Sequence, residues 1–296
     1  MQVNPLICYM TTVFYEREFF NVKDTLECGQ LFRFKQNSVL SGKVGETAYT
    51  VYSSDKACYV YNKGDKAVIV CEEKDKNYFY GYFDLERDYS EVYKRAVSLG
   101  GTLAVSASLG KGVRILNQNP EEALFSFIIS QNNNIPRIKG IIERLCALFG
   151  KEKSFNGEKY FAFPTAKELK DSDIKIFTDA GLGYRAPYIK NLADNFDGIF
   201  NMEEMQGLNT EELKKRLLSI YGVGPKVADC VSLFGFHRSD SFPVDTWIEK
   251  VYRENLGGTL KNRDKIAKEL VDKFGENAGY FQQYLFYYKR SMENAK

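Results

Sequence analysis

The run 222–226, Gly-Val-Gly-Pro-Lys, ends in a lysine whose position favours nucleophilic chemistry. Pro225 fits the first turn of a helix, so Lys226 would lie at the positive end of that helix. The helix end and the loss of surrounding water both favour a neutral amine, which can attack an electrophilic carbon and form a Schiff base. The alternatives for Lys226 are a phosphate contact or simple exposure to solvent.

The glycines of this run predict a hairpin between two helices, one over about 210–220 and one over about 225–235. Gly222 and Gly224 permit positive φ and a tight reversal of the chain. Backbone N–H groups left exposed at the start of the second helix suit a phosphate oxygen, and the missing side chains allow close approach. The structural alternative is a tight turn that packs two helices and binds nothing.

Asp245, in Phe-Pro-Val-Asp-Thr-Trp at 242–247, is the second residue whose type and position favour a role in catalysis. An aspartate before a helical run, here over about 245–255, is an ordinary helix cap. A capping carboxylate held at a fixed angle can also stabilise a developing positive charge or orient a nucleophile. Antiparallel packing of the second helix against the next one would bring Asp245 near Lys226.

Composition and charge limit what else the chain could be. The 296 residues, 44% hydrophobic and 27% charged, are typical of a globular protein with about two domains. The net charge of +2 is lower than that of a purely electrostatic nucleic-acid binder, so any such contact would depend on local charge and backbone donors. Basic residues gather at 214–216 and at Arg185 and Lys190, which we interpret as solvated helix faces.

Cysteine and histidine usage argues against a zinc site or an iron–sulfur cluster. His237 is the single histidine, and no Cys-x-x-Cys spacing occurs. Scattered cysteines are typical of a reducing compartment rather than of a disulfide framework. The six positions are Cys8, Cys28, Cys58, Cys71, Cys146 and Cys230.

The start of the chain lacks the basic segment of a signal peptide, and no run approaches the roughly 20 apolar residues of a membrane span. We therefore expect an intracellular protein with no membrane partner. Its place would be the cytoplasm or nucleoid, or the nucleus in a eukaryote.

The elements that must position these residues predict an α+β fold. Up to about residue 115 the chain is rich in strand-forming runs at 48–52, 58–61 and 67–71, separated by turn residues, with a helix near 89–99. Helical signals dominate afterwards, beginning with Asn-Pro-Glu-Glu at 119–122. We predict an antiparallel β-rich domain over 1–115 and an all-α domain over 116–296, with its helix-hairpin-helix at about 210–235. The other helices are expected at 119–129, 136–149, 186–197, 245–255, 262–274 and 277–292.

The run 222–230 followed by Pro-Val-Asp at 243–245 resembles the helix-hairpin-helix DNA glycosylase superfamily. A lysine at 226 resembles its bifunctional branch, which also nicks abasic sites. The resemblance sharpens to the 8-oxoguanine DNA glycosylases of the eukaryotic-like type and extends over nearly the whole chain. The further runs that carry it lie at 28–33, 84–89, 112–116, 124–128, 132–138, 143–146 and 181–186.

This resemblance implies a substrate and a mechanism. The substrate would be duplex DNA containing 8-oxoguanine, whose damaged base must leave the stack to be cut. Lys226 would attack the sugar carbon C1′ while Asp245 stabilises positive charge, and β-elimination from the Schiff base would nick the strand. The resemblance implies no metal ion or organic cofactor, and we expect a monomer.

The resemblance also assigns binding roles. The backbone oxygen of Gly29 would accept the N7–H that distinguishes the lesion, and Gln282 would read the Watson–Crick edge. Phe286 and Cys230 would lie on the two sides of the base. The residues expected to contact DNA are Asn132, Arg137, Tyr184, Arg185, Gly222 and Gly224.

One position departs from the family pattern. Trp247 stands two residues after Asp245, where the animal enzymes carry histidine, so no contact is carried over to it. Two other readings remain open: a monofunctional glycosylase for another damaged base, and a DNA-binding module without catalysis. An iron–sulfur glycosylase of the endonuclease III type is disfavoured because no cysteine follows Cys230.

Overall fold

The strand-forming runs of the first part pair into one antiparallel sheet. The structure is a computed structural model that describes residues 9–294, so Cys8 and the expectation for the start of the chain lie outside it. The sheet has the strand order β1-β5-β4-β3-β2, and the three expected strands are its central members. The strands are β1 (Met10–Glu16), β2 (Phe34–Gln36), β3 (Ala48–Ser53), β4 (Lys56–Lys63) and β5 (Lys66–Glu72).

Short turns fix the register of this sheet. Ser53 pairs with Lys56 across the β3–β4 turn, and Lys63 pairs with Lys66 across the β4–β5 turn. Apolar side chains on one face of the sheet form a core with Phe79 and Phe83. Three helices belong to this part of the chain: α1 (Val22–Glu27), α2 (Ser38–Val44) and α3 (Lys76–Tyr82).

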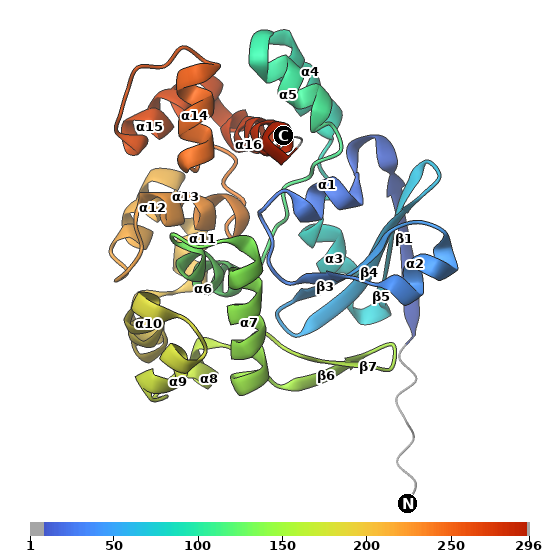
Figure 1. Cartoon of the computed structure of the whole chain (residues 1–296), viewed down its shortest axis with the longest axis vertical. Helices are drawn as coiled ribbons and strands as arrows, with labels where there is room; N and C mark the ends of the chain where they lie inside the picture. The colour runs from blue at the N-terminus through green and yellow to red at the C-terminus, as the bar shows by residue number, and fades with distance from the viewer. Residues whose placement is uncertain (1–8, 295–296) are drawn as a thin grey trace, which may run out of the picture.

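The second part is helical, as predicted (Figure 1). Local capping explains where many of these helices begin. The Asn119 side chain accepts from the Glu122 backbone N–H at the start of α6, and Asn134 caps α7 in the same way. The helices of this part are α6 (Pro120–Ser130), α7 (Ile135–Phe149), α8 (Ala166–Leu169), α9 (Ile174–Asp179), α10 (Ala186–Ile199), α11 (Met202–Gly207), α12 (Thr210–Leu218), α13 (Pro225–Phe234), α14 (Thr246–Glu254), α15 (Arg263–Phe274) and α16 (Ala278–Asn294).

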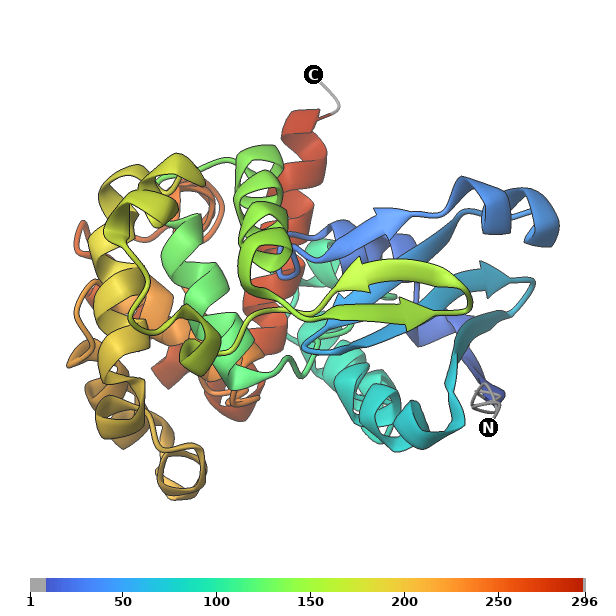
Figure 2. The ribbon, with the colours of Figure 1, turned by 90° about the horizontal axis from the view of Figure 1, so that it is seen from below.

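The helical part also contains a β-hairpin that was not predicted. Its strands are β6 (Glu152–Phe155) and β7 (Glu158–Phe161), and it reaches across to the N-terminal sheet (Figure 2). Phe155 packs there with Tyr52 and Tyr59. The turn is Asn156-Gly157 with φ of 48° and 83°, the combination that favours a tight hairpin. The hairpin therefore fastens the helical part to the sheet.

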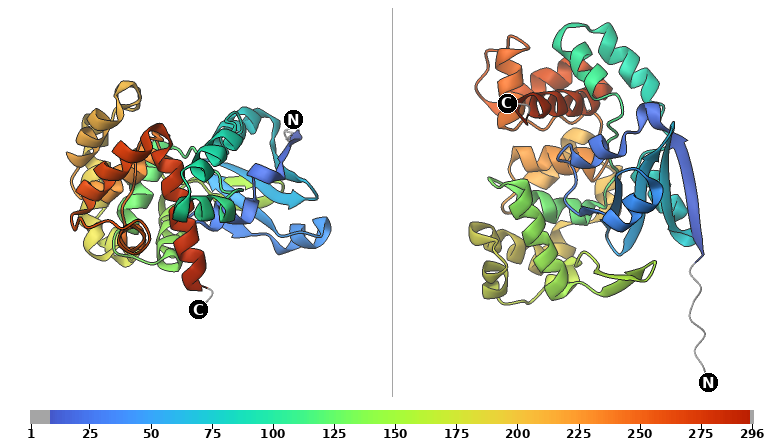
Figure 3. Two further views of the ribbon diagram at one scale, coloured as in Figure 1. Left: turned by 90° about the horizontal axis from the view of Figure 1, so that it is seen from above. Right: turned by 45° about the vertical axis from the view of Figure 1, so that its right-hand side comes forward.

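Two helices that precede residue 116 join the core of the helical part. They are α4 (Tyr89–Ser98), which was expected, and α5 (Gly101–Leu109), which was not. Both lie beside the C-terminal helix α16 (Figure 3), and α5 contacts it directly. The division at 115 and 116 stays a prediction, with the added detail that these two helices pack beyond it.

Two further features bear on the sequence-based expectations. The cysteines at 28, 58, 71, 146 and 230 are all free thiols. Across residues 9–294, every helix is too short or too polar to cross a lipid bilayer.

Candidate active site

The predicted helix-hairpin-helix is formed by α12 and α13, and one of its two glycines makes the reversal. Gly222 has φ of 87°, and a β-carbon built on it would lie 2.4 Å from Cγ of Tyr188. The Gln131 side chain donates to the Gly222 carbonyl at 2.8 Å and ties the hairpin to the end of α6. Gly224 is different: it caps α13 in an extended conformation, with φ of −96° and open space around its Cα. Of the two glycines that permit positive φ, only Gly222 adopts it.

Lys226 and Asp245 line one cavity of about 570 Å³, as the sequence predicted. The Lys226 amine lies 5.2 Å from the centre of the Phe127 ring, and no ion pair engages it within residues 9–294.

Asp245 is held by the helix that it caps. One of its carboxylate oxygens accepts from the backbone N–H groups of Trp247 and Ile248, each at 2.9 Å. Burial raises the pKa of the Asp245 carboxyl, and these two amides together with the charge of Lys226 oppose the rise. Asp245 can therefore be a helix cap and also stabilise a positive charge, because one of its oxygens fixes the carboxylate at the cavity wall.

Four residues expected to read the base line the same cavity: Gly29, Cys230, Gln282 and Phe286. The Gln282 amide donates to the Pro243 carbonyl at 3.2 Å, while its oxygen is buried without a hydrogen-bond partner. Burial raises the pKa of the Cys230 thiol to about 11, so at neutral pH Cys230 is an uncharged wall of the cavity.

Gly29 lies against Phe286. It has φ of 91°, and a β-carbon there would come within 3.2 Å of the Phe286 ring and of the Arg290 guanidinium. A side chain at 29 would therefore press on the aromatic face that borders the cavity. Glycine is needed at this position for its backbone conformation and for the space that it leaves open.

The residues expected to contact DNA gather on the loop between α6 and α7 and on the 3₁₀ turn at 183–185. Asn132 lines the cavity with a strained φ of 45°. Tyr184 is 52% exposed and donates its hydroxyl to the Gln131 carbonyl at 3.1 Å. Arg137 is exposed and donates to the Gly181 carbonyl at 3.3 Å.

Arg185 differs from the sequence-based picture of an open DNA contact. Its side chain is buried, and its guanidinium donates to the carbonyls of Gln131 and Asn132, the latter at 2.9 Å. The Tyr184 ring covers it, with 4.3 Å between the guanidinium carbon and the ring centre. In this structure Arg185 shapes the loop that carries Asn132 and does not line the cavity.

Comparison with known proteins agrees with this geometry. Residues 12–124 match the family model described as the 8-oxoguanine DNA glycosylase N-terminal domain, and residues 125–276 match that of the HhH-GPD superfamily base excision DNA repair proteins. The chain belongs to the 8-oxoguanine DNA glycosylase family of this superfamily.

Individual relatives are similar over most of their length. A crystal structure of Clostridium acetobutylicum 8-oxoguanine glycosylase/lyase, in complex with double-stranded DNA containing cytosine opposite to 8-oxoG, is 38% identical with a TM-score of 0.86, covering 93% of each chain. The N-glycosylase/DNA lyase of Saccharomyces cerevisiae is 30% identical, covering 85% of this chain and 72% of the relative. A probable N-glycosylase/DNA lyase of Methanothermobacter thermautotrophicus is also 30% identical, over 70% of this chain and 72% of the relative.

Sequence reasoning missed several residues of this family member's cavity. Gln283 donates to the Cys28 carbonyl at 3.3 Å, and Arg290 donates to the Glu27 carbonyl at 2.7 Å. Both line the cavity and hold the backbone beside Gly29. Their spacing of two helical turns on α16 is the one sequence signal, and it does not say which segment they contact. Phe127, Trp247 and Arg263 also line the cavity.

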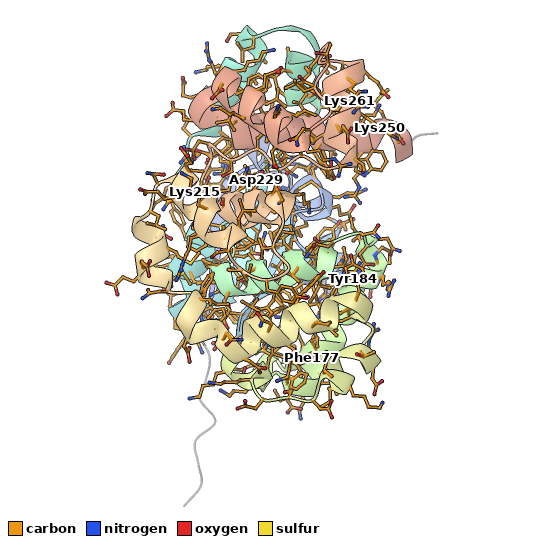
Figure 4. The ribbon with its side chains drawn as sticks, turned by 90° about the vertical axis from the view of Figure 1, so that its left-hand side faces the viewer. Phe177, Tyr184, Lys215, Asp229, Lys250 and Lys261 are labelled. Atoms are coloured by element: carbon orange, nitrogen blue, oxygen red, sulfur yellow. The ribbon has the colours of Figure 1, made fainter. Side chains whose placement is uncertain are left out.

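Two lysines of the basic cluster at 214–216, which we interpreted as a solvated helix face, pair with carboxylates. Lys214 pairs with the buried Asp229 at 2.9 Å, and Lys215 pairs with Glu211 at 2.8 Å. Figure 4 shows Lys215 on one side of the helical part and Tyr184, Lys250 and Lys261 on the other. Burial raises the pKa of Asp229 to about 6, against the opposing charge of Lys214.

A metal centre finds no support in the described part of the chain. Between residues 9 and 294 no three His, Cys, Asp or Glu side chains are grouped so that they could hold an ion. The groups that the cavity offers for chemistry are an amine, a carboxylate, amides and aromatic rings.

Proposed function

We propose that this protein is a bifunctional DNA glycosylase and abasic-site lyase that excises 8-oxoguanine from duplex DNA. The observation that carries the proposal is a single cavity lined by Lys226, Asp245 and Gln282, whose side-chain oxygen is buried and has no hydrogen-bond partner. The family membership and the names of the relatives support the lesion and both activities. We further propose that the protein acts as a monomer wherever cellular DNA lies, in the nucleoid or the nucleus.

Base recognition would use groups that are already placed. A buried acceptor without a partner costs roughly 1–3 kcal/mol, and a donor on the Watson–Crick edge of a flipped guanine would satisfy the Gln282 oxygen. The Pro243 carbonyl engages the nitrogen of the Gln282 amide, which leaves the amide oxygen as the group that can accept. Phe286 would stack on one side of the base with Cys230 on the other, and the Gly29 carbonyl would accept the N7–H that guanine lacks.

The chemical steps follow from the amine and the carboxylate. The nitrogen lone pair of Lys226 forms a bond to C1′ while the glycosidic C1′–N9 bond breaks, and its electrons leave with the base, which takes up a proton. The Asp245 carboxylate stabilises the positive charge that develops on the sugar. Opening of the sugar ring gives a protonated Schiff base, loss of a C2′ proton expels the 3′ phosphate, and water then releases Lys226.

The space left by the flipped nucleotide would be occupied from the loop that contains Asn132. Tyr184 is exposed enough to enter the stack, and Arg137 is exposed at the start of α7, where it could reach the orphan cytosine. The direct role of Arg185 at the cytosine stays a prediction, because reaching it would mean breaking the hydrogen bonds to the loop carbonyls. Its present contacts support a role in presenting Asn132.

Borohydride trapping on a labelled duplex with one 8-oxoguanine opposite cytosine tests the proposal. Wild-type protein should give a covalent adduct, while an undamaged duplex and a Lys226→Gln variant should give none. Lys215→Gln, on the far face of the hairpin, is the matched control and should trap like wild type. Release of free base without an adduct would indicate a monofunctional glycosylase, and binding without release would indicate a DNA-binding module.

A further inference from the structure

A second cavity, of about 360 Å³, lies between the β2–β3 edge of the sheet, α7 and the β6–β7 hairpin. Its size is at the lower end of the range for small-molecule sites. The first part of the chain, α7 and the hairpin each contribute to it, and Figure 2 shows the hairpin crossing toward the sheet at this place. No step of the glycosylase reaction uses this cavity.

Its lining combines aromatic rings with positive charge. Phe34, Tyr52, Tyr160 and Phe161 supply the rings, and the Phe161 side chain is 38% exposed. Tyr52 and Tyr160 lie with their ring centres 5.1 Å apart, which leaves aromatic surface at the wall of the cavity. Rings of this kind stack on planar bases without selecting one base.

The cations of the cavity exceed its carboxylates. Arg33, Lys35, Lys139 and Lys159 line it together with one acid, Glu143. Lys35 and Lys159 pair with glutamates outside the lining, at 3.6 Å and 2.8 Å. Arg33 pairs with Glu143 at 3.7 Å, so Lys139 is the one of the four that forms no ion pair with a described residue and is available to a negatively charged group.

Two of these cations are incompletely satisfied by the protein. Lys139 forms no ion pair within residues 9–294, and its amine lies 3.4 Å from the centre of the Phe34 ring. Burial lowers the pKa of Lys139, and the negative charges of Glu27 and Glu143 oppose the fall. Arg33 is 2% exposed, and its Nε has no hydrogen-bond partner, with Glu143 at 3.7 Å.

We propose that this cavity binds a nucleoside monophosphate unit, with the base against the tyrosine and phenylalanine rings and the phosphate on Lys139. Aromatic rings beside lysines form the pattern that binds unpaired nucleotides. The unit could be a free mononucleotide or an unpaired nucleotide of the DNA strand. Phe32 lines both this cavity and the active-site cavity, so the two sites are neighbours on either side of one residue.

Calorimetric titration with dAMP tests the site, because an adenine nucleotide lacks the features for which the lesion cavity is suited. Wild type and Lys226→Gln should bind dAMP equally, and Lys139→Gln should bind it about tenfold more weakly or worse, as for one lost charge-assisted hydrogen bond. Lys151→Gln, at a surface lysine paired with Glu168, is the control and should match wild type. Phe161→Ser, which alters an exposed ring, provides a second variant if Lys139→Gln folds poorly.

The fluorescence of the single tryptophan distinguishes binding in one cavity from binding in the other. Trp247 lines the active-site cavity and not the second one, so its fluorescence should stay constant while dAMP binds. Absence of binding by wild type, equal binding by Lys139→Gln and by Phe161→Ser, or a Trp247 signal that follows the same isotherm would overturn the proposal. Deoxyadenosine and inorganic phosphate should each bind more weakly than dAMP, and equal binding by either would also contradict it.

A binding experiment with DNA distinguishes a free mononucleotide from an unpaired nucleotide of the DNA strand. If the unit belongs to DNA, a 3′ or 5′ single-stranded extension on an 8-oxoguanine duplex should strengthen binding to Lys226→Gln but not to the Lys226→Gln, Lys139→Gln double variant. If extensions change nothing while dAMP still binds through Lys139, the ligand is a free nucleotide. The trapping assay is independent of both results, so this proposal and the proposed glycosylase function can fail separately.

Discussion

The two hairpin glycines should respond to the same added methyl group in different ways. In Gly222→Ala the new carbon would meet the Tyr188 ring at 2.4 Å, in a residue whose φ is 87°. The left-handed backbone costs an alanine about 1–2 kcal/mol, and overpacking adds about 1–3 kcal/mol. We therefore expect Gly222→Ala to lower the free energy of unfolding by about 2–5 kcal/mol.

In Gly224→Ala the methyl group meets no atom within 4 Å, and φ is −96°. Stability should fall by at most about 1 kcal/mol, the range for a changed helix cap. If the amides of the hairpin bind a phosphate, as the sequence predicts, the same methyl group would hinder its approach. Loss of one charge-assisted hydrogen bond should weaken binding to duplex DNA about tenfold or more.

Urea unfolding followed by circular dichroism measures the first quantity, and fluorescence anisotropy of a labelled 8-oxoguanine duplex measures the second. Binding is measured in a Lys226→Gln background so that no turnover occurs. Gly198→Ala, in the open surface of α10, is the control and should be neutral or slightly stabilising with unchanged DNA affinity. Gly224→Ala that unfolds as readily as Gly222→Ala, or that binds DNA like wild type, would refute the reasoning.

Further predictions concern three polar side chains, Asp245, Gln282 and Asp229. Asp245→Asn keeps a helix cap of equal quality and should change the free energy of unfolding by less than about 1 kcal/mol. Excision should fall at least about 100-fold, because the charge of the carboxylate is lost. An Asp245→Asn variant with normal single-turnover rates would contradict this. Wild-type excision should also slow as pH falls through the raised pKa of Asp245, which a rate–pH profile would show as an acidic limb, and a flat profile would count against it. Gln282→Leu loses the hydrogen bond to Pro243 but also removes the buried oxygen that has no partner. The free energy of unfolding should therefore change by less than about 1 kcal/mol, while kcat/KM for the lesion should fall at least about tenfold. The reverse pattern would mean that Gln282 is structural. For Asp229 the pKa is raised to about 6, so the folded chain holds the proton more tightly than the unfolded chain. The resulting stabilisation is complete below the unfolded pKa of about 4 and is lost as pH rises through about 6. Relative to Asp229→Asn, the wild-type free energy of unfolding should therefore fall by about 3 kcal/mol over this window in urea titrations, and parallel curves for the two proteins would exclude it.

Helices with local signals were predictable, and elements fixed by distant contacts were not. Asn119 and Asn134 are caps that mark their helices in the sequence, and both act as caps in the structure. Helix α5 begins at Gly100 without a side-chain cap, so its place depends on packing against α16. The β6–β7 hairpin did have a local signal, the Asn156-Gly157 turn, which the helical surroundings obscured.

The residues of the site also divide into those with local sequence signals and those whose positions depend on distant contacts. The hairpin and the helix cap, both readable from neighbouring residues, led us to expect Lys226 and Asp245 near each other, and both line one cavity in the structure. The buried position of Arg185 did not follow, because its acceptors are carbonyls more than fifty positions away. Gln283 was missed for the same reason, since its partner Cys28 is 255 positions distant.

The closure of the cavity by α16 has a consequence for protein synthesis. The last helix brings Gln282 and Phe286 to the wall, and Tyr287 donates its hydroxyl to Asp24 at 2.7 Å, joining the two ends of the chain. Contacts between such distant residues form late in folding, because a long loop must close first. Until α16 has been made and has packed, the chain therefore lacks the wall that would hold a flipped base. A chain that ends before α16 should not recognise the lesion.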